Sequence, residues 1–501
     1  MLCTLLAVPA LDVRAQAPDE HPVPLRPFVT CVEAIPGAKL RVHWGYLNTT
    51  KSDLQRALGP DNRLSSAGAS SPPTTFRPGF TVEAFSSEFA QGAQSSWSLD
   101  GIAATANARS HRCTAAQKSA SPSELINPAP GAPLFLGANF WNLDWQGSQE
   151  YFVDQPRFAS GSSPWLPQFL RDLEPYHVLR FMDWNLTNDA DNPQSRWTTR
   201  RPKGQAQREP IAYEWQIDLC NRTHKDCWLT VPHAASTQYF SQLAQLVREQ
   251  LDASLRVYVE WSNEVWNGSF PQHEYAGALA AQLGLAGEDP AAAYQVYQSV
   301  RLFEAFTAVF GADNPRVVRV LAGQAGYVGP CKAQLAALTD PKINPKHTRP
   351  DVYAIAPYVH GRTLQELRST GMARAKAGIA ENLRCARGAR LPLIAYEGGQ
   401  DSFALGVEAC ERLQRDQGMR ALYAALPDAL AAAGLRGPFV HYTHSGACWG
   451  LKVKTTDSNA ASPKYQGLLD WQRKQSGAPK TKSRTSAKPQ PAAAVTSPAA
   501  P

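Results

Sequence analysis

The stretch Val257-Tyr-Val-Glu-Trp-Ser-Asn-Glu-Val-Trp-Asn267 decides the fold. Its first half, from Arg256 to Trp261, alternates β-branched and aromatic residues, which predicts a short buried strand. The strand leads into Ser262-Asn263-Glu264, a polar turn with one tryptophan before it and another, Trp266, after it. This setting suits sugar chemistry, because indole rings stack on pyranose faces and exclude water from a neighbouring carboxyl group. The alternative is a solvated polar loop that follows a core strand.

Seven further apolar segments have the length of a strand, and helical patterns separate most of them. The eight predicted strands cover residues 134–140, 178–183, 228–233, 256–261, 317–323, 352–358, 391–396 and 439–444. The predicted helices include residues 165–174, 237–251, 291–310, 372–384 and 410–434. Strands that alternate with helices predict a parallel sheet, and eight of them predict a (β/α)8 barrel. In that fold the active site lies at the C-terminal ends of the strands.

Two glutamates follow predicted strands at that end of the barrel. Glu264 follows the fourth strand, and Glu397, in Ile394-Ala-Tyr-Glu-Gly-Gly-Gln400, follows the seventh. Strands four and seven lie across a barrel from each other, so the two carboxyl groups are expected to face each other. Glycoside hydrolysis needs one protonated carboxyl group, which donates to the leaving oxygen, and one carboxylate, which attacks the sugar or activates water. The alternative for Glu397 is a turn carboxylate beside a Gly-Gly break.

The residues near each glutamate predict which one is the acid. Asn263 and the tryptophans at 261 and 266 suit Glu264 as the proton donor. Arg180, if it points inward from the second strand, is expected to keep Glu397 ionised. Tyr396 or Tyr358 could then donate a hydrogen bond to the same carboxylate.

This arrangement resembles the retaining glycoside hydrolases of clan A, over residues 133 to 475. The resemblance implies that Glu264 is the acid/base, Glu397 the nucleophile and Asn263 the partner of the sugar 2-hydroxyl. It also implies substrate-binding roles at four other strand ends, for Arg180, for His233, for either Tyr358 or His360, and for Trp449 as the ring under the sugar that is attacked. Trp141 and Trp266, near the first and fourth strands, complete the predicted substrate-binding set. The insertion 184–215 and the stretch 220–227 match no member of that clan, so the resemblance does not specify the substrate.

Other chemistries have little support in the sequence. No Cys-x-x-Cys pair or zinc-finger histidine spacing is present, and His233 has no clustered partner, so no metal site is predicted. Ser262 lacks the Gly-x-Ser-x-Gly elbow, which disfavours an esterase or peptidase. Gly398-Gly399 is followed by no Lys-Ser/Thr and is therefore not a phosphate loop. The net charge of +7 in 501 residues is modest, and no nucleic-acid-binding motif accompanies it. No cofactor is expected.

The N-terminal part predicts a separate module. Residues 1–17 resemble a shortened secretory signal peptide, and residues 28–117 contain alternating strand patterns that predict a small immunoglobulin-like β-sandwich. A Pro/Ser/Ala-rich linker, 118–132, precedes the catalytic barrel at 133–475, and a Lys/Pro/Ala-rich tail, 476–501, is expected to be disordered. The sandwich rings Trp44, Tyr46 and Trp97 either bind carbohydrate or fill the core, and the second interpretation is favoured.

Cysteine usage favours an exported protein. Nine cysteines minus Cys3 of the signal leave eight, an even number that can pair in an oxidising compartment. By position we expect the pairs Cys31–Cys113, Cys220–Cys227, Cys331–Cys385 and Cys410–Cys448.

The sequence therefore predicts a secreted or periplasmic monomer with no membrane span, which cleaves β-glycosidic bonds of a polysaccharide, in endo mode and with retention. Two alternatives remain open: a polysaccharide-binding protein on a barrel scaffold, and a transglycosylase of cell-envelope or exopolysaccharide metabolism.

Overall fold

The computed structural model describes residues 25–475, except residues 49, 51, 66–70, 78, 109, 111–112, 114–133, 141–164, 191, 193, 204–209, 286 and 313. The predicted signal peptide (1–17), linker (118–132) and tail (476–501), and the predicted substrate-binding residue Trp141, lie outside the described residues.

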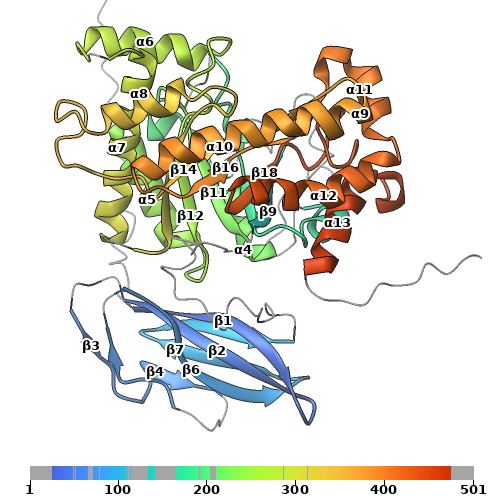
Figure 1. Cartoon of the computed structure of the whole chain (residues 1–501). Helices are drawn as coiled ribbons and strands as arrows, with labels where there is room; N and C mark the ends of the chain where they lie inside the picture. The colour runs from blue at the N-terminus through green and yellow to red at the C-terminus, as the bar shows by residue number, and fades with distance from the viewer. Residues whose placement is uncertain are drawn as a thin grey trace, which may run out of the picture.

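The predicted (β/α)8 barrel is confirmed. Eight parallel strands close in the order β10-β11-β12-β13-β14-β16-β18-β9, and helices surround them (Figure 1). The barrel strands are β9 Leu134–Asn139, β10 Val178–Arg180, β11 Asp226–Val231, β12 Val257–Trp261, β13 Val317–Ala322, β14 Val352–Ile355, β16 Leu393–Ala395 and β18 Gly437–His441. Each lies within or overlaps one of the eight predicted segments.

Strand alternation divides the barrel side chains between two cores. In β12, Tyr258 packs with the apolar residues of the barrel interior, whereas Val257, Val259 and Trp261 pack in the larger core that also contains helix side chains. Neighbouring side chains of a strand point to opposite faces, so Glu260 shares the inner face with Tyr258. The barrel is therefore a filled core, with a polar residue at its fourth strand.

The described helices are α3 Pro167–Asp172, α4 Tyr213–Thr223, α5 Thr237–Gln250, α6 Pro271–Gln282, α7 Pro290–Phe310, α8 Gly329–Ala337, α9 Leu364–Glu366, α10 Met372–Gly388, α11 Val407–Gln414, α12 Gly418–Ala433 and α13 Pro463–Gln475. Sequence analysis did not anticipate α4, α6 and α8. The single helix predicted over 410–434 is two helices, α11 and α12. Asp416 accepts a hydrogen bond from the Gly418 amide (2.7 Å), and this local bond starts a second helix. Two short parallel strands, β15 Tyr358–His360 and β17 Gly399–Asp401, pair outside the barrel.

The N-terminal strands are antiparallel, which agrees with the predicted small β-sandwich. They are β1 Leu25–Ile35, β2 Lys39–Asn48, β3 Leu54–Gln55, β4 Asn62–Leu64, β5 Thr75–Phe76, β6 Gly79–Ala90, β7 Gln94–Leu99 and β8 Ile102–Asn107. The sheets β1-β2-β6 and β4-β7-β8 meet through Trp44 and Trp97, whose ring centroids are 6.3 Å apart. Both rings are fully buried and Tyr46 is nearly so, so these aromatic residues fill the core. Asp100 and Gly101 both have positive φ, as the turn of a two-residue hairpin requires.

All four expected disulfide pairs are present: Cys31–Cys113, Cys220–Cys227, Cys331–Cys385 and Cys410–Cys448. Their Cα–Cα distances, 4.8 to 6.5 Å, lie within the usual range for disulfides. No helix among the described residues has the length and apolar composition needed to cross a membrane.

Candidate active site

Arg180, the last residue of β10, connects the polar groups inside the barrel. Its guanidinium is completely buried and donates to the carboxylates of Glu260 (2.8 Å) and Glu397 (2.7 Å). It also donates to the amide oxygen of Asn263 (2.9 Å). A buried guanidinium needs such partners, because its charge has lost the solvation of water.

Glu260 was not among the residues singled out in the sequence. It comes from the middle of β12 and accepts hydrogen bonds from Arg180 and from the indole of Trp228 (2.9 Å). Burial raises the pKa of Glu260, and the adjacent guanidinium opposes that effect. Its position beneath the strand end makes it a support for Arg180. The sequence signal was a charged residue at an inward-facing position of an apolar strand, since such a residue needs a buried partner.

Glu397, two residues after β16, is held from two sides. Arg180 donates to one carboxylate oxygen, and the Tyr358 hydroxyl donates to the other (2.9 Å). Burial raises the pKa of Glu397, while Arg180 and the hydrogen bond from Tyr358 lower it. Because the positive charge of Arg180 touches this carboxylate, a single negative charge shared between Glu397 and Glu264 resides on Glu397.

Glu264 lies three residues after β12, and its donors among the described residues are neutral. The Tyr396 hydroxyl (3.1 Å) and the Asn267 amide (3.1 Å) donate to its two oxygens. Burial and the charge of Glu397 raise the pKa of Glu264 to about 8. At neutral pH, Glu264 is therefore mainly protonated. Its backbone is in the left-handed region (φ 43°), as is that of Ser262 (φ 61°), a local strain of the kind that occurs at functional sites.

A third carboxyl group, Asp183, lies at the same mouth. It ends the predicted strand 178–183, and it accepts a hydrogen bond from the Tyr442 hydroxyl (3.0 Å). Burial and the charge of Glu397 raise the pKa of Asp183 to about 7. In the sequence it is followed by a polar stretch that includes Asp189, and it therefore looks like one residue of a solvated loop. Its place at the end of the second predicted strand is the signal that points to the site.

The eighth strand presents a different aromatic residue from the one predicted. Tyr442 directly follows β18, and its ring lies 6.5 Å from that of Tyr358, the hydrogen-bond partner of Glu397. Trp449, predicted to lie under the attacked sugar, is one ring further out, 6.2 Å from Tyr442. Tyr442, the residue nearest the end of β18, therefore lies beside Tyr358 at the centre of the mouth, in the place predicted for Trp449.

The structure separates the two aromatic candidates of the sixth strand. Tyr358 contacts Glu397, whereas His360 is 58% exposed and pairs with Asp401 (3.0 Å). His233, after β11, packs its ring against Tyr275 (4.9 Å), and burial lowers the pKa of its imidazole.

The fourth strand end differs from the prediction in one respect. Trp266 donates to the Tyr396 hydroxyl (3.3 Å), which in turn donates to Glu264, so this indole does lie next to the acid. Trp261 instead points to the outer face of the barrel and packs edge-on against Tyr294 (5.7 Å). Strand alternation places it opposite Glu260, so it does not flank Glu264.

The side-chain amides of Asn263 and Gln272 fix the turn that carries Glu264. The Asn263 side chain accepts from Arg180 and donates to the side-chain oxygen of Asn188 (3.1 Å). Gln272, at the start of α6, donates to the Asn263 carbonyl (2.6 Å). A cavity of about 450 Å³ opens beside this turn, lined by Asp183, Leu186, Thr187, Asn188, Asp189, Ala190 and Pro271. Within the described part of the chain, no group of three or more His, Cys, Asp or Glu side chains could hold a metal ion.

Comparisons with known proteins give structural similarities only. No family model matches the sequence, and no curated protein is significantly similar to it. Among solved structures, it is similar to a 4-O-α-L-rhamnosyl-β-D-glucuronidase from Fusarium oxysporum 12S, at 16% identity and a TM-score of 0.42, over 69% of this chain and 71% of that one. It is also similar to a GH51 arabinofuranosidase from Xanthomonas axonopodis pv. citri (12%, TM-score 0.45, 67% and 72%). A third is a modular endo-β-1,4-mannanase from Cellulomonas fimi (11%, TM-score 0.43, 70% and 74%). No activity of this chain follows from these similarities.

Proposed function

We propose that the protein is a glycoside hydrolase that cleaves β-glycosidic bonds of a polysaccharide with retention of configuration. The observation that supports this most directly is the unequal environment of the two carboxyl groups. Glu264 has neutral donors and a pKa raised to about 8, whereas Glu397 touches the guanidinium of Arg180. Glycoside hydrolysis requires one protonated and one ionised carboxyl group at the same bond.

In the proposed reaction, Glu397 attacks the anomeric carbon of the sugar while Glu264 protonates the oxygen that leaves. Loss of that proton ionises Glu264, which then takes a proton from water as water releases the sugar from Glu397. Tyr358 keeps the carboxylate of Glu397 oriented by its hydrogen bond. Asn263, fixed by Arg180 and Asn188, is positioned to bind a hydroxyl of the attacked sugar.

We further propose that the enzyme attacks within chains and acts outside the cytoplasm. The cavity is lined by Asp183 and Asn188, which contact Tyr442 and Asn263, and its room for a further sugar of the chain supports endo attack. The four disulfides support an oxidising compartment.

The experiment that tests the function is release of reducing ends from soluble β-glucans, mannans, xylans and bacterial exopolysaccharides. Wild type is compared with Glu264→Gln, Glu397→Gln and the control Glu304→Gln. Glu304 lies on the outer helix α7 and pairs with Lys346. We expect release from one class of substrate, lost in the first two variants and retained in the control. Binding without release would favour a binding protein, and products longer than the substrate would favour a transglycosylase. NMR of the first product anomer tests retention.

A further inference from the structure

We propose that the rings of Phe403 and Trp449 form a second sugar-binding platform, which holds a neutral pyranose of the substrate chain away from the bond that is cleaved. This inference rests on the proposed function, because the occupant is another residue of the same polysaccharide. It assigns a role to three residues that the reaction itself does not use: Phe403, Asp401 and His360.

The two rings make one apolar surface. Their centroids are 4.7 Å apart and their planes differ by 22°, so they are stacked. Phe403 is 45% exposed, among the few large apolar side chains described as exposed, and Trp449 is partly exposed. Stacking covers one face of each ring and leaves the rest of Phe403 open to solvent. A pyranose ring, whose faces carry C–H groups, is a suitable partner for this exposed aromatic surface.

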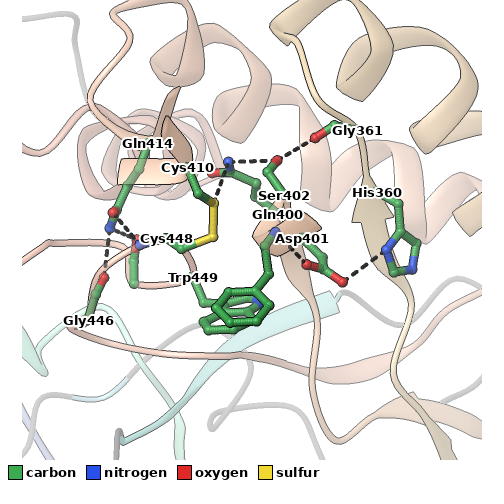
Figure 2. Close-up of a disulfide and its surroundings, with 12 residues drawn as sticks. His360, Gly361, Gln400, Asp401, Ser402, Cys410, Gln414, Gly446, Cys448 and Trp449 are labelled. Atoms are coloured by element: carbon green, nitrogen blue, oxygen red, sulfur yellow. Dashed lines mark hydrogen bonds and ion pairs between the residues drawn. A yellow bond between two sulfur atoms is a disulfide. The ribbon is translucent and has the colours of Figure 1, made fainter. Parts of the chain in front are cut away.

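The loop that carries Trp449 is held firmly before any ligand binds. Figure 2 shows the Cys410–Cys448 disulfide, which joins α11 to the residue just before Trp449. The buried side chain of Gln414 donates to the carbonyls of Gly446 (2.9 Å) and Gly450 (2.7 Å), and accepts from the Cys448 amide (2.8 Å). Such anchoring lowers the entropy that the platform would lose on binding.

A second anchor lies under the same loop. The buried side-chain nitrogen of Lys464 donates to the carbonyls of Cys448 (2.9 Å) and Trp449 (3.0 Å). Hydrogen bonds of this kind fix the backbone on both sides of the indole, although the indole itself is partly exposed.

A carboxylate stands at the edge of the platform. Asp401 accepts from the Phe403 amide (3.1 Å) and pairs with His360 (3.0 Å), as Figure 2 shows for His360. Burial would raise the pKa of Asp401, but hydrogen bonds from His360, from the Phe403 amide and from Trp449 lower it overall. The group therefore stays ionised. A carboxylate accepts hydrogen bonds from sugar hydroxyls and repels an acidic sugar, so the platform favours a neutral pyranose.

The platform is continuous with the catalytic carboxylate. Trp449 contacts Tyr442 edge-on, Tyr442 contacts Tyr358, and Tyr358 donates to Glu397. Two further rings thus separate the platform from Glu397, so a sugar stacked there is not the one attacked. Glu264, the proposed proton donor to the leaving oxygen of the substrate, follows β12, whereas Trp449 follows β18 on another side of the barrel mouth. The platform therefore lies on the side of the sugar that becomes bound to Glu397, away from the leaving group.

The test measures the affinity of the Glu397→Gln protein for cellohexaose, mannohexaose and xylohexaose, and for the matching disaccharides, by isothermal titration calorimetry. Phe403→Ala and Asp401→Asn are introduced into that background. Val407→Ala, which removes a similarly exposed apolar side chain from α11, is the matched control. For the hexasaccharide that binds, we expect Phe403→Ala to raise the dissociation constant about tenfold more than it does for the matching disaccharide. We expect Val407→Ala to change neither dissociation constant. We expect Asp401→Asn to weaken hexasaccharide binding as well.

Two results would overturn the platform: equal losses for the hexasaccharide and its disaccharide, or no binding of any hexasaccharide. The hydrolase proposal fails by a different result, namely hexasaccharide binding and a Phe403→Ala effect without release of reducing ends by the wild type. Circular dichroism of each variant confirms that the comparison concerns folded protein.

Discussion

The strand ends at β12 and β16 each bring one glutamate to the barrel mouth, yet the two sites differ in charge. Glu397 touches the guanidinium of Arg180, whereas the donors to Glu264 are an amide and a phenol. Glu397 is buried and Glu264 is half-buried, so burial raises both pKa values, and the position of one arginine decides which group is ionised. Residue type and burial therefore leave the chemical role of each glutamate open until the neighbouring charge is known.

The largest effect is expected from removing the ionised member of the pair. Glu397→Ala should lower kcat on the order of 10⁴-fold, because the carboxylate that attacks the sugar is removed. Azide should restore part of the rate for an aryl glycoside and give a glycosyl azide of inverted configuration. The measurement is release of the phenol with and without azide. If azide instead rescued Glu264→Ala and gave the inverted glycosyl azide, Glu264 would be the nucleophile and Glu397 the acid.

Substitution of Glu264 is expected to give a smaller loss of rate, which depends on the substrate. Glu264→Gln should lower the rate about 10²- to 10⁴-fold on a natural glycoside, and far less on an aryl glycoside whose phenol leaves without a proton. The wild-type kcat/KM should fall as pH rises past about 8, since the acid is then ionised. In Glu264→Gln that alkaline decrease should vanish. If the decrease remained unchanged, another group would be the acid.

The arginine that creates the difference should matter for stability. Arg180→Met leaves the carboxylates of Glu260 and Glu397 buried without a cation, which should cost about 3–5 kcal/mol in the free energy of unfolding. Urea denaturation measures it. The control Arg222→Met breaks an exposed pair with Asp218 within α4 and should cost less than about 1 kcal/mol. Equal losses in the two variants would mean that the buried network contributes nothing specific.

A second stability effect comes from the raised pKa of Glu264. The ordinary pKa of Glu264 is 4.5 and its folded value is about 8, so between these pH values the folded state binds more protons than the unfolded state. Folding stability from this group is therefore complete below pH 4.5 and lost as pH rises through 8. Glu264→Gln stays neutral, so its Tm relative to wild type should be higher at pH 9 than at pH 5. Thermal unfolding at the two pH values checks this; a constant difference would contradict the raised pKa.

Much of the barrel could be predicted because its signals are local. Each strand is a short run of β-branched and aromatic residues, and the order of strands and helices implies a parallel closed sheet. The candidate glutamates were found because they follow two of these runs. The helices α4, α6 and α8 were missed, since α6 and α8 are rich in alanine and lack a strongly apolar face, and α4 begins inside a segment that looked like a polar insertion.

Within the candidate site, the missed residues are those whose meaning depends on a distant partner. Glu260 and Asp183 look like an ordinary strand carboxylate and a loop carboxylate until Arg180 and Tyr442 are brought to them. Trp261 looked like a neighbour of Glu264, but the alternation of the strand turns it to the outer face.

The sequence alone determined the strand pattern, the positions of two glutamates at strand ends, and an even set of cysteines that pair as expected. These follow from local periodicity and from counting, which need no knowledge of distant contacts. Only the tertiary structure decided that Glu397 lies against a cation, that Glu264 lies among neutral donors, and that Trp449 stacks on Phe403 while Trp44 and Trp97 are buried. The physical reason is that pKa values and exposure depend on distances of a few ångströms between residues far apart in the chain, and closure of the barrel sets those distances.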